Sequence, residues 1–133
     1  MRWRIFSLVF GLLPTAALGQ AYNCANWETP GFSMGPQVYA YCAQRDYQAA
    51  DARLNDLWAD LLPLLGPETE EDVRAAQRAW IAHRDAHCQT IVGLIWAGGT
   101  GRFAAEMVCK RDETMERILE LEALQAYLTT NPS

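Results

Sequence analysis

The sequence predicts a small all-α protein, an antiparallel three-helix bundle that carries an irregular N-terminal arm and two disulfides. Long segments repeat apolar residues at helical spacing, and no segment alternates apolar and polar residues over a useful length, so we expect no sheet. The chain has 4 cysteines, an even number, after a segment that looks like a secretory signal. Short connections would make the three helices run up, down and up.

Residues 1–19 have the three parts of a secretory signal. Two arginines form the charged start, an apolar stretch follows, and Ala17-Leu18-Gly19 is a small-x-small cleavage site. A membrane anchor is the alternative, but Pro14 interrupts the stretch, which is shorter than the roughly 20 residues that a spanning helix needs. We therefore expect a periplasmic or secreted protein of one domain, residues 20–133, with no membrane segment after cleavage.

Removal of the signal makes the chain more acidic. The sequence has 16 acidic residues against 11 basic ones, of which two, Arg2 and Arg4, belong to the signal, so the formal charge changes from −5 to −7. Such a surface repels nucleic acid and anionic lipid and attracts basic proteins at long range. We expect no nucleic-acid partner.

The first predicted helix covers about residues 38–62, where apolar side chains recur at helical spacing. Pro63 and Gly66-Pro67 end it, because proline cannot continue a helix. Prolines and glycines between residues 30 and 36 disfavour regular structure before it. The arm is therefore expected to be irregular up to the start of this helix.

The second predicted helix covers about residues 69–95. Thr69 can cap its N-terminus, Asp72 stands three residues on as a weaker form of the capping box, and neighbouring glutamates suit the positive end of the helix. The third predicted helix covers about residues 103–128.

One face of the second helix is unusual, because it mixes an aromatic ring, a cation and a thiol where an ordinary amphipathic helix has leucine and alanine. The four residues along it are Gln77, Trp80, Arg84 and Cys88. We expect Trp80 to pack in the core with Gln77 and Arg84 beside it. We also expect Arg84 to pair structurally with an acid such as Asp51 or Asp46 rather than to meet a ligand.

The cysteines are expected to gather at one end of the bundle. The up-down-up topology brings Cys42, Cys88 and Cys109 together there, and Cys24 arrives from the arm. Three pairings are possible. The pairing of nearest neighbours, Cys24 with Cys42 and Cys88 with Cys109, would tie the arm to the first helix and close the glycine-rich loop.

That loop, Gly98-Gly99-Thr100-Gly101, could be taken for a phosphate cradle. It lacks the lysine that follows such cradles, and no strand precedes it, so we expect a turn into the third helix. Accessible loops at the surface often carry partner contacts, as do exposed aromatic side chains. The candidate contact residues are Trp27 and Phe32 in the arm and Gly98, Gly99 and Thr100 in the loop.

Metal binding and catalysis find little support in the sequence. There is no C-x-x-C pair, and His83 and His87, one helical turn apart, lack a visible third ligand. The cysteines are expected to be oxidised, and Ser33 and Ser133 stand in no strained turn that would activate a nucleophile. We expect no metal, no cofactor and no enzyme activity.

Several short motifs follow one another along the chain in a characteristic order. They are Cys42, Ala49-Ala50-Asp51-Ala52-Arg53-Leu54-Asn55, Ala76-Gln77-Arg78-Ala79-Trp80-Ile81, Arg84-Asp85-Ala86, Cys88, Gly98-Gly99-Thr100, Cys109, Thr114, Arg117 and Leu121. In this order they resemble the family of secreted bacterial domains typified by the lysozyme inhibitor LprI, over most of the chain after the signal. The sequence departs from the family at His83 and His87, where the family usually has an aromatic residue and often an acidic one.

The resemblance implies a small, helical, disulfide-bonded protein outside the cytoplasm that binds and inhibits a lysozyme, without catalysis. The acidic surface suits a basic lysozyme and would mainly raise the rate of encounter. The alternative is an envelope interaction module with another partner. The family-motif residues, for which we expect structural roles, are Leu54, Asn55, Gln77, Trp80, Arg84, Asp85 and Arg117.

Overall fold

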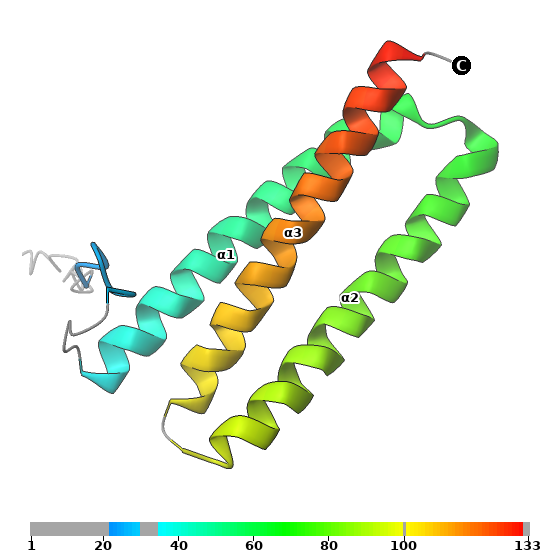
Figure 1. Ribbon diagram of the computed structural model, residues 1–133. Coiled ribbons are helices and arrows are strands. Elements are labelled where there is room, and N and C mark those ends of the chain that lie inside the picture. Colours follow the sequence, from blue (N-terminus) through cyan, green and yellow to red (C-terminus); the bar gives the residue numbers. More distant parts are fainter. Residues whose placement is uncertain (1–21, 30–34, 100, 132–133) are drawn as a thin grey trace, which may run out of the picture.

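A computed structural model of the protein describes residues 22–29, 35–99 and 101–131 (Figure 1). Helix α1 (Pro36–Leu61) continues into a short 3-10 turn, η1 (Leu62–Leu64), and is followed by α2 (Pro67–Trp96) and α3 (Arg102–Thr130). The described residues contain no strand, and the helices run antiparallel in sequence order. The predicted three-helix bundle is confirmed. The predicted signal, together with Phe32 and Thr100, lies outside the described residues.

Glycine–proline pairs set the starts of α1 and α2. Gly35 and Gly66 are the N-cap residues, both in extended conformation, and a proline is the first residue of each helix. The prediction that Thr69 caps α2 is wrong, because Pro67 starts the helix earlier: its fixed φ suits the first turn, and it has no N–H to leave unpaired. Thr69 lies inside the first turn, where its hydroxyl donates to the carbonyl oxygen of Gly66 at 3.0 Å.

Helix α3 packs against both other helices, whereas α1 and α2 stand further apart (Figure 1). The buried side chains along α1 and α3 form two separate apolar clusters. One surrounds Cys42 and Met107 near the arm, and the other contains Leu54, Leu61 and Ile118 toward the opposite end. None of the helices in the described ranges is long and apolar enough to cross a bilayer.

The four cysteines form two disulfides at the same end of the bundle. Cys24 pairs with Cys42, with their Cα atoms 5.5 Å apart, and Cys88 pairs with Cys109, with a Cα separation of 5.6 Å. The nearest-neighbour pairing is the one found. The first bond ties the arm to α1, and the second ties the end of α2 to the start of α3.

The arm lies against the bundle through Trp27. Its side chain is only 5% exposed, its Nε1 donates to Oδ2 of Asp46 at 2.8 Å, and its ring meets Tyr39 edge to face with 4.9 Å between centroids. The prediction that Trp27 is an exposed aromatic is therefore wrong. A carboxylate on α1 satisfies the indole N–H, which lets the ring bury its apolar surface beside the first disulfide.

Replacing Cys24 and Cys42 together by alanine should lower the free energy of unfolding by about 3 kcal/mol, because the bond no longer restricts the unfolded chain. Residues 22–29 should lose their hydrogen-exchange protection while the three helices keep theirs. The matched variant without the Cys88–Cys109 bond should lose similar stability but keep the arm protected. Equal protection of the arm in both variants would show that Trp27 alone holds it.

Candidate functional site

A buried guanidinium joins the three helices at their middle. Arg84 of α2 is 5% exposed, and its Nη1 lies 3.2 Å from Oδ1 of Asp51 in α1 and donates to Oγ1 of Thr114 in α3, also at 3.2 Å. Its Nε donates to Asp85 at 3.0 Å. Arg84 thus pairs with Asp51, as predicted, whereas Asp46 accepts from the arm instead.

Two aromatic rings and one hydroxyl complete the surroundings of Arg84. The centroids of the Trp80 and Tyr47 rings lie 5.2 Å and 5.4 Å from its guanidinium carbon, within range of cation–π attraction. Thr114 is fully buried, and its hydroxyl donates a hydrogen bond to the carbonyl oxygen of Lys110 at 2.7 Å. Nε and Nη1 of this cation are therefore hydrogen-bonded, and two aromatic rings lie beside it.

Burial and neighbouring charges act on these groups in opposite directions. Desolvation alone would lower the pKa of Arg84, but the hydrogen bond to Asp85 and the attraction of nearby acidic groups outweigh it and raise that pKa. Burial raises the pKa of Tyr47, against the opposing charge of Arg84. Arg84 is therefore charged and Tyr47 neutral at neutral pH.

Arg117 of α3 places a second guanidinium beside the Trp80 ring. The Nε of Arg117 donates to Oε1 of Gln77 at 3.0 Å, its Nη1 donates to Glu120 at 2.7 Å, and its guanidinium carbon lies 5.7 Å from the Trp80 centroid. Trp80 is half-buried and packs against the apolar cluster that contains Leu54. The motif face of α2 is therefore held by two cations, one from its own helix and one from α3.

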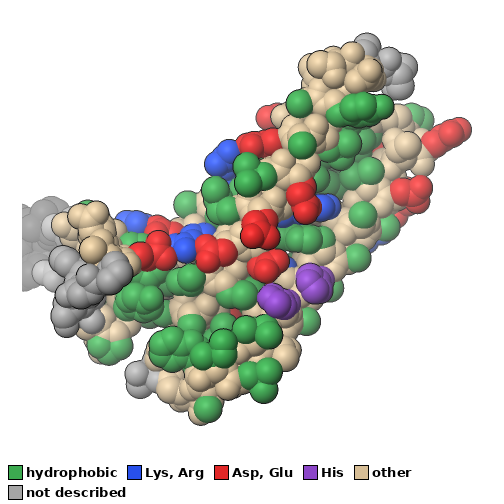
Figure 2. Space-filling view, in the orientation of Figure 1, with side chains coloured by type: hydrophobic (Ala, Val, Ile, Leu, Met, Phe, Trp, Pro, Cys, Tyr) green, Lys and Arg blue, Asp and Glu red, His purple; other side chains and the backbone are tan. Residues whose placement is uncertain are grey.

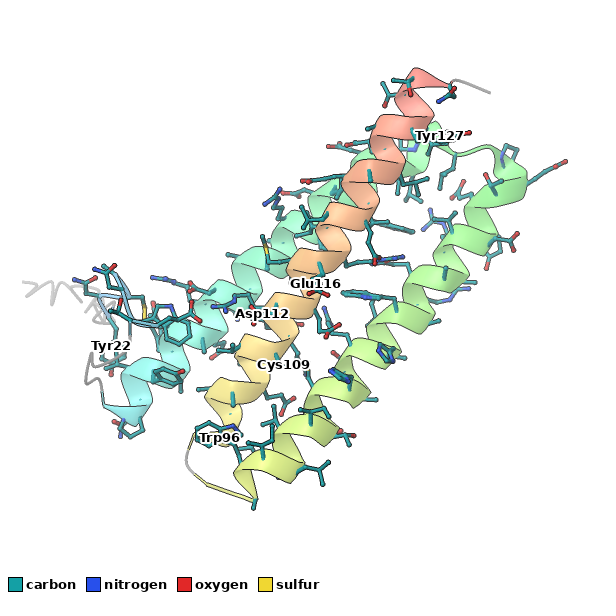
Figure 3. The ribbon with its side chains drawn as sticks, viewed as in Figure 1. Tyr22, Trp96, Cys109, Asp112, Glu116 and Tyr127 are labelled. Carbon is teal, nitrogen blue, oxygen red and sulfur yellow. A yellow bond between two sulfur atoms is a disulfide. The ribbon has the colours of Figure 1, made fainter. Side chains whose placement is uncertain are left out.

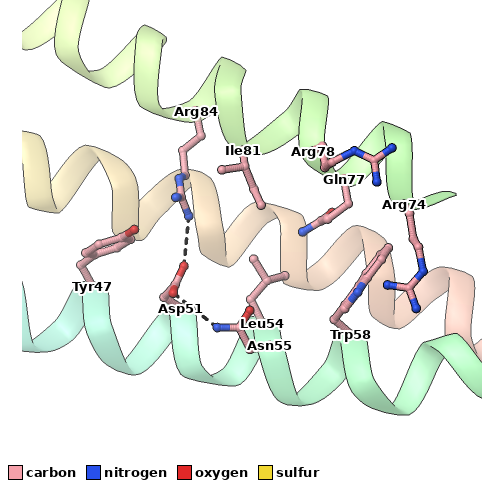
Figure 4. Close-up of a pocket in the computed structure, with 10 residues that line it drawn as sticks. All are labelled: Tyr47, Asp51, Leu54, Asn55, Trp58, Arg74, Gln77, Arg78, Ile81 and Arg84. Atoms are coloured by element: carbon pink, nitrogen blue, oxygen red, sulfur yellow. Dashed lines mark hydrogen bonds and ion pairs between the residues drawn. The ribbon is translucent and has the colours of Figure 1, made fainter. Parts of the chain in front are cut away.

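Between α1 and α2 lies a groove of about 410 Å³ (Figure 4). We call it the interhelix groove. It exists because large polar side chains, rather than small apolar ones, fill the space between these two helices. The residues that line it are Tyr47, Asp51, Leu54, Asn55, Trp58, Arg74, Gln77, Arg78, Ile81 and Arg84. Four family-motif residues, Leu54, Asn55, Gln77 and Arg84, thus meet in one concave surface.

The turn between α2 and α3 carries exposed apolar side chains, and Figure 2 shows hydrophobic atoms gathered at that end of the molecule. Leu94 and Ile95 are 76% and 71% exposed. Together these side chains form a surface that we call the hairpin tip: Ile91, Leu94, Ile95, Trp96 and Phe103. Exposed apolar patches of this kind mark interaction sites.

The glycines of the loop shape the hairpin tip. Gly98 has φ +91°, and Gly98 and Gly99 are both exposed, next to the apolar side chains. A Cβ on Gly101 would lie 2.6 Å from Cζ3 of Trp96, so a larger residue there would displace the indole that packs on the turn. Gly98 and Gly99, two of the predicted contact residues, therefore lie beside the hairpin tip, which the sequence interpretation missed. A run of apolar residues that covers every face of a helix, 91–96, was the signal for it.

Acidic side chains line the exposed face of α3. Asp112, Glu116 and Glu120, which we call the acidic row, are exposed and follow one another at intervals of four residues, so they lie on one face of the helix. Figure 3 labels the first two of these, and Figure 2 shows acidic atoms along the same helix.

The two histidines lie side by side on α2. The ring centroids of His83 and His87 are 5.7 Å apart, and Nε2 of His87 is 3.7 Å from Oε1 of Glu113. In the described parts of the chain, no group of three or more His, Cys, Asp or Glu side chains is arranged to hold a metal ion.

Replacing Arg84 by alanine should lower the free energy of unfolding by about 3 kcal/mol, measured by urea denaturation, because it leaves Asp51 and Thr114 without their shared donor. Arg53→Ala is the matched control: its guanidinium pairs with Glu122 on the surface, and its loss should change stability by about 0.5 kcal/mol or less. Unchanged stability in the Arg84 variant would contradict a structural role.

Comparisons with known proteins identify the family of this chain. The family model described as lysozyme inhibitor LprI matches residues 33–121. An uncharacterized protein of Rhizobium meliloti (strain 1021) is 32% identical over 96 residues, which cover 62% of this chain and 68% of that protein. No solved structure matches the chain. By the extent of the family match, the chain belongs to the lysozyme inhibitor LprI family.

Proposed function

We propose that this protein binds a lysozyme outside the cytoplasm and inhibits it without catalysis of its own. The observation that carries the proposal is the match to the lysozyme inhibitor family over residues 33–121. The signal-like segment 1–19 and the two disulfides support an exported protein, since disulfides persist in oxidising compartments.

We place the lysozyme contact on the hairpin tip. Burial of the exposed Leu94 and Ile95 side chains against a partner would remove apolar surface from contact with water. This hydrophobic effect is the usual driving force of protein association. The Cys88–Cys109 bond and the packing of Trp96 on the turn hold the tip in shape before it binds. A preorganised surface loses less conformational entropy on binding.

The acidic row supports a basic partner. Three carboxylates lie on one face of α3, where Asp112 pairs with Arg111 and Glu120 pairs with Arg117. The net negative charge of the chain attracts a positively charged protein over distances of about 10 Å at ordinary salt. Such attraction raises the association rate more than it lowers the dissociation rate.

The first test is a lysis assay. The oxidised protein lacking residues 1–19 should slow the lysis of a peptidoglycan suspension by lysozyme in proportion to its concentration. Leu94→Glu should weaken this inhibition by about tenfold or more, because it places a charge in the apolar contact. Absence of inhibition against several lysozyme classes would overturn the proposal and favour another envelope partner.

Tyr127→Glu is the matched control for the hairpin tip. Tyr127 is 63% exposed and lies at the end of α3 opposite Trp96 (Figure 3), so the same charge is added to an exposed apolar surface far from the tip. It should leave inhibition unchanged. Equal losses in the two variants would place the contact elsewhere than on the tip.

The acidic row has a kinetic test. Asp112→Lys combined with Glu116→Lys should lower the association rate with a basic lysozyme several-fold at low salt, with little change in dissociation, and added salt should narrow the difference. The control is Asp56→Lys combined with Asp60→Lys. These are two exposed acids of α1, so the change in net charge is the same. Equal slowing by both pairs would mean that the position of the row has no effect.

A further inference from the structure

We infer that the interhelix groove binds a ring-shaped organic carboxylate, such as an acidic N-acetyl sugar. This site is separate from the hairpin tip and does not depend on lysozyme binding. Its volume of about 410 Å³ lies within the range of small-molecule sites, which begins at about 300 Å³. The evidence for a ligand comes from two buried side chains that present unused donors to the groove.

The first of these donors is the amide nitrogen of Gln77. This side chain is 8% exposed, and its Oε1 accepts from Arg117 at 3.0 Å. Because a guanidinium can only donate, the oxygen must face Arg117 and the nitrogen must face away from it. The Nε2 of Gln77 makes no hydrogen bond with the described residues, and Figure 4 shows the side chain reaching from α2 toward α1.

The second donor is Nη2 of Arg84. The other two nitrogens of this guanidinium are used by Asp85, Asp51 and Thr114, while Nη2 makes no hydrogen bond within the described ranges. No buried side-chain nitrogen or oxygen in that part of the chain lacks a partner. Nε2 of Gln77 and Nη2 of Arg84 are therefore both accessible, and both belong to residues that line the interhelix groove.

The guanidiniums of the lining can pair with an anion. Three of the lining side chains are guanidiniums, Arg74, Arg78 and Arg84, and Asp51 is the one acid among the described residues that line the groove. Arg84 already pairs with Asp51 and with Asp85. Arg74 and Arg78 pair with Glu70 and Glu71 at the surface, where exposed ion pairs exchange partners at little cost. A carboxylate can accept from a guanidinium and from the Gln77 amide together.

The remaining residues of the lining favour a ligand that contains a ring. Trp58 and Tyr47 offer aromatic faces on which the C–H side of a sugar can lie, and Leu54 adds aliphatic surface. The side chain of Asn55, whose Nδ2 reaches Asp51 at 3.4 Å, keeps its amide oxygen for a hydroxyl or an N–H.

The test is a titration followed by amide and indole N–H resonances in NMR, with the oxidised protein lacking residues 1–19. N-acetylmuramic acid should shift the Gln77 side-chain and Trp58 indole signals. N-acetylglucosamine lacks only the carboxylate-bearing lactyl group. Its affinity should be lower by about tenfold or more, because it loses the charge-assisted hydrogen bonds. Inorganic phosphate should not displace the sugar acid.

Variants outside the fold-determining network complete the test. Arg78→Gln should weaken binding of N-acetylmuramic acid by about two- to fivefold and leave N-acetylglucosamine unaffected, because an exposed cation at the mouth is lost. Arg53→Gln, an exposed arginine outside the groove, is the control and should change neither. Leu94→Glu should also bind the sugar acid normally, which separates this site from the lysozyme contact.

Three outcomes would overturn the inference. Unshifted Gln77 and Trp58 signals at millimolar N-acetylmuramic acid would show that the groove takes no such ligand. Equal affinity for N-acetylglucosamine would remove the role of the carboxylate. Displacement by inorganic phosphate would show a groove that holds any small anion.

Discussion

The buried guanidinium of Arg84 is the interaction on which the arrangement of the helices depends. The two apolar clusters occupy the contact between α1 and α3, so α2 has little apolar core of its own to share. Instead, the charged side chain of Arg84 extends from α2 and contacts Asp51 in α1 and Thr114 in α3. A charge buried in this way is costly unless it is fully partnered, which restricts α2 to the one position where its partners are in reach.

That restriction explains why the molecule has an open groove. A helix held by long polar side chains stands further from its neighbour than one held by alanine and leucine, and α2 stands apart from α1 in this way (Figure 1). The same side chains then line the space that they create. The Cys88–Cys109 bond supplies the stability that apolar contact would otherwise give to the end of α2, so Leu94 and Ile95 can remain exposed.

The sequence predicted the helices and the end at which the cysteines meet, because helical periodicity and breaking residues are local signals. It failed where a tertiary contact or a neighbouring residue decided the outcome. Trp27 was expected at the surface, but Asp46, distant in sequence, accepts its indole proton. Thr69 resembled an N-cap, but Pro67 begins the helix before it. The interhelix groove had no sequence signal, since it arises only when two helices are placed side by side at a particular distance.

The distribution of charge links the two proposed sites. The side chains of Arg84, Lys110, Arg111 and Arg117 are each more buried than every acid with which they pair. These four cations therefore lie further inside the bundle than their carboxylates. Of the four, Arg84 lines the interhelix groove, where the more exposed Arg74 and Arg78 join it. An acidic exterior and a cation-lined groove have opposite preferences for charge. One small bundle can in this way attract a basic protein to its surface and hold a carboxylate between its helices, without either ligand competing for the same groups.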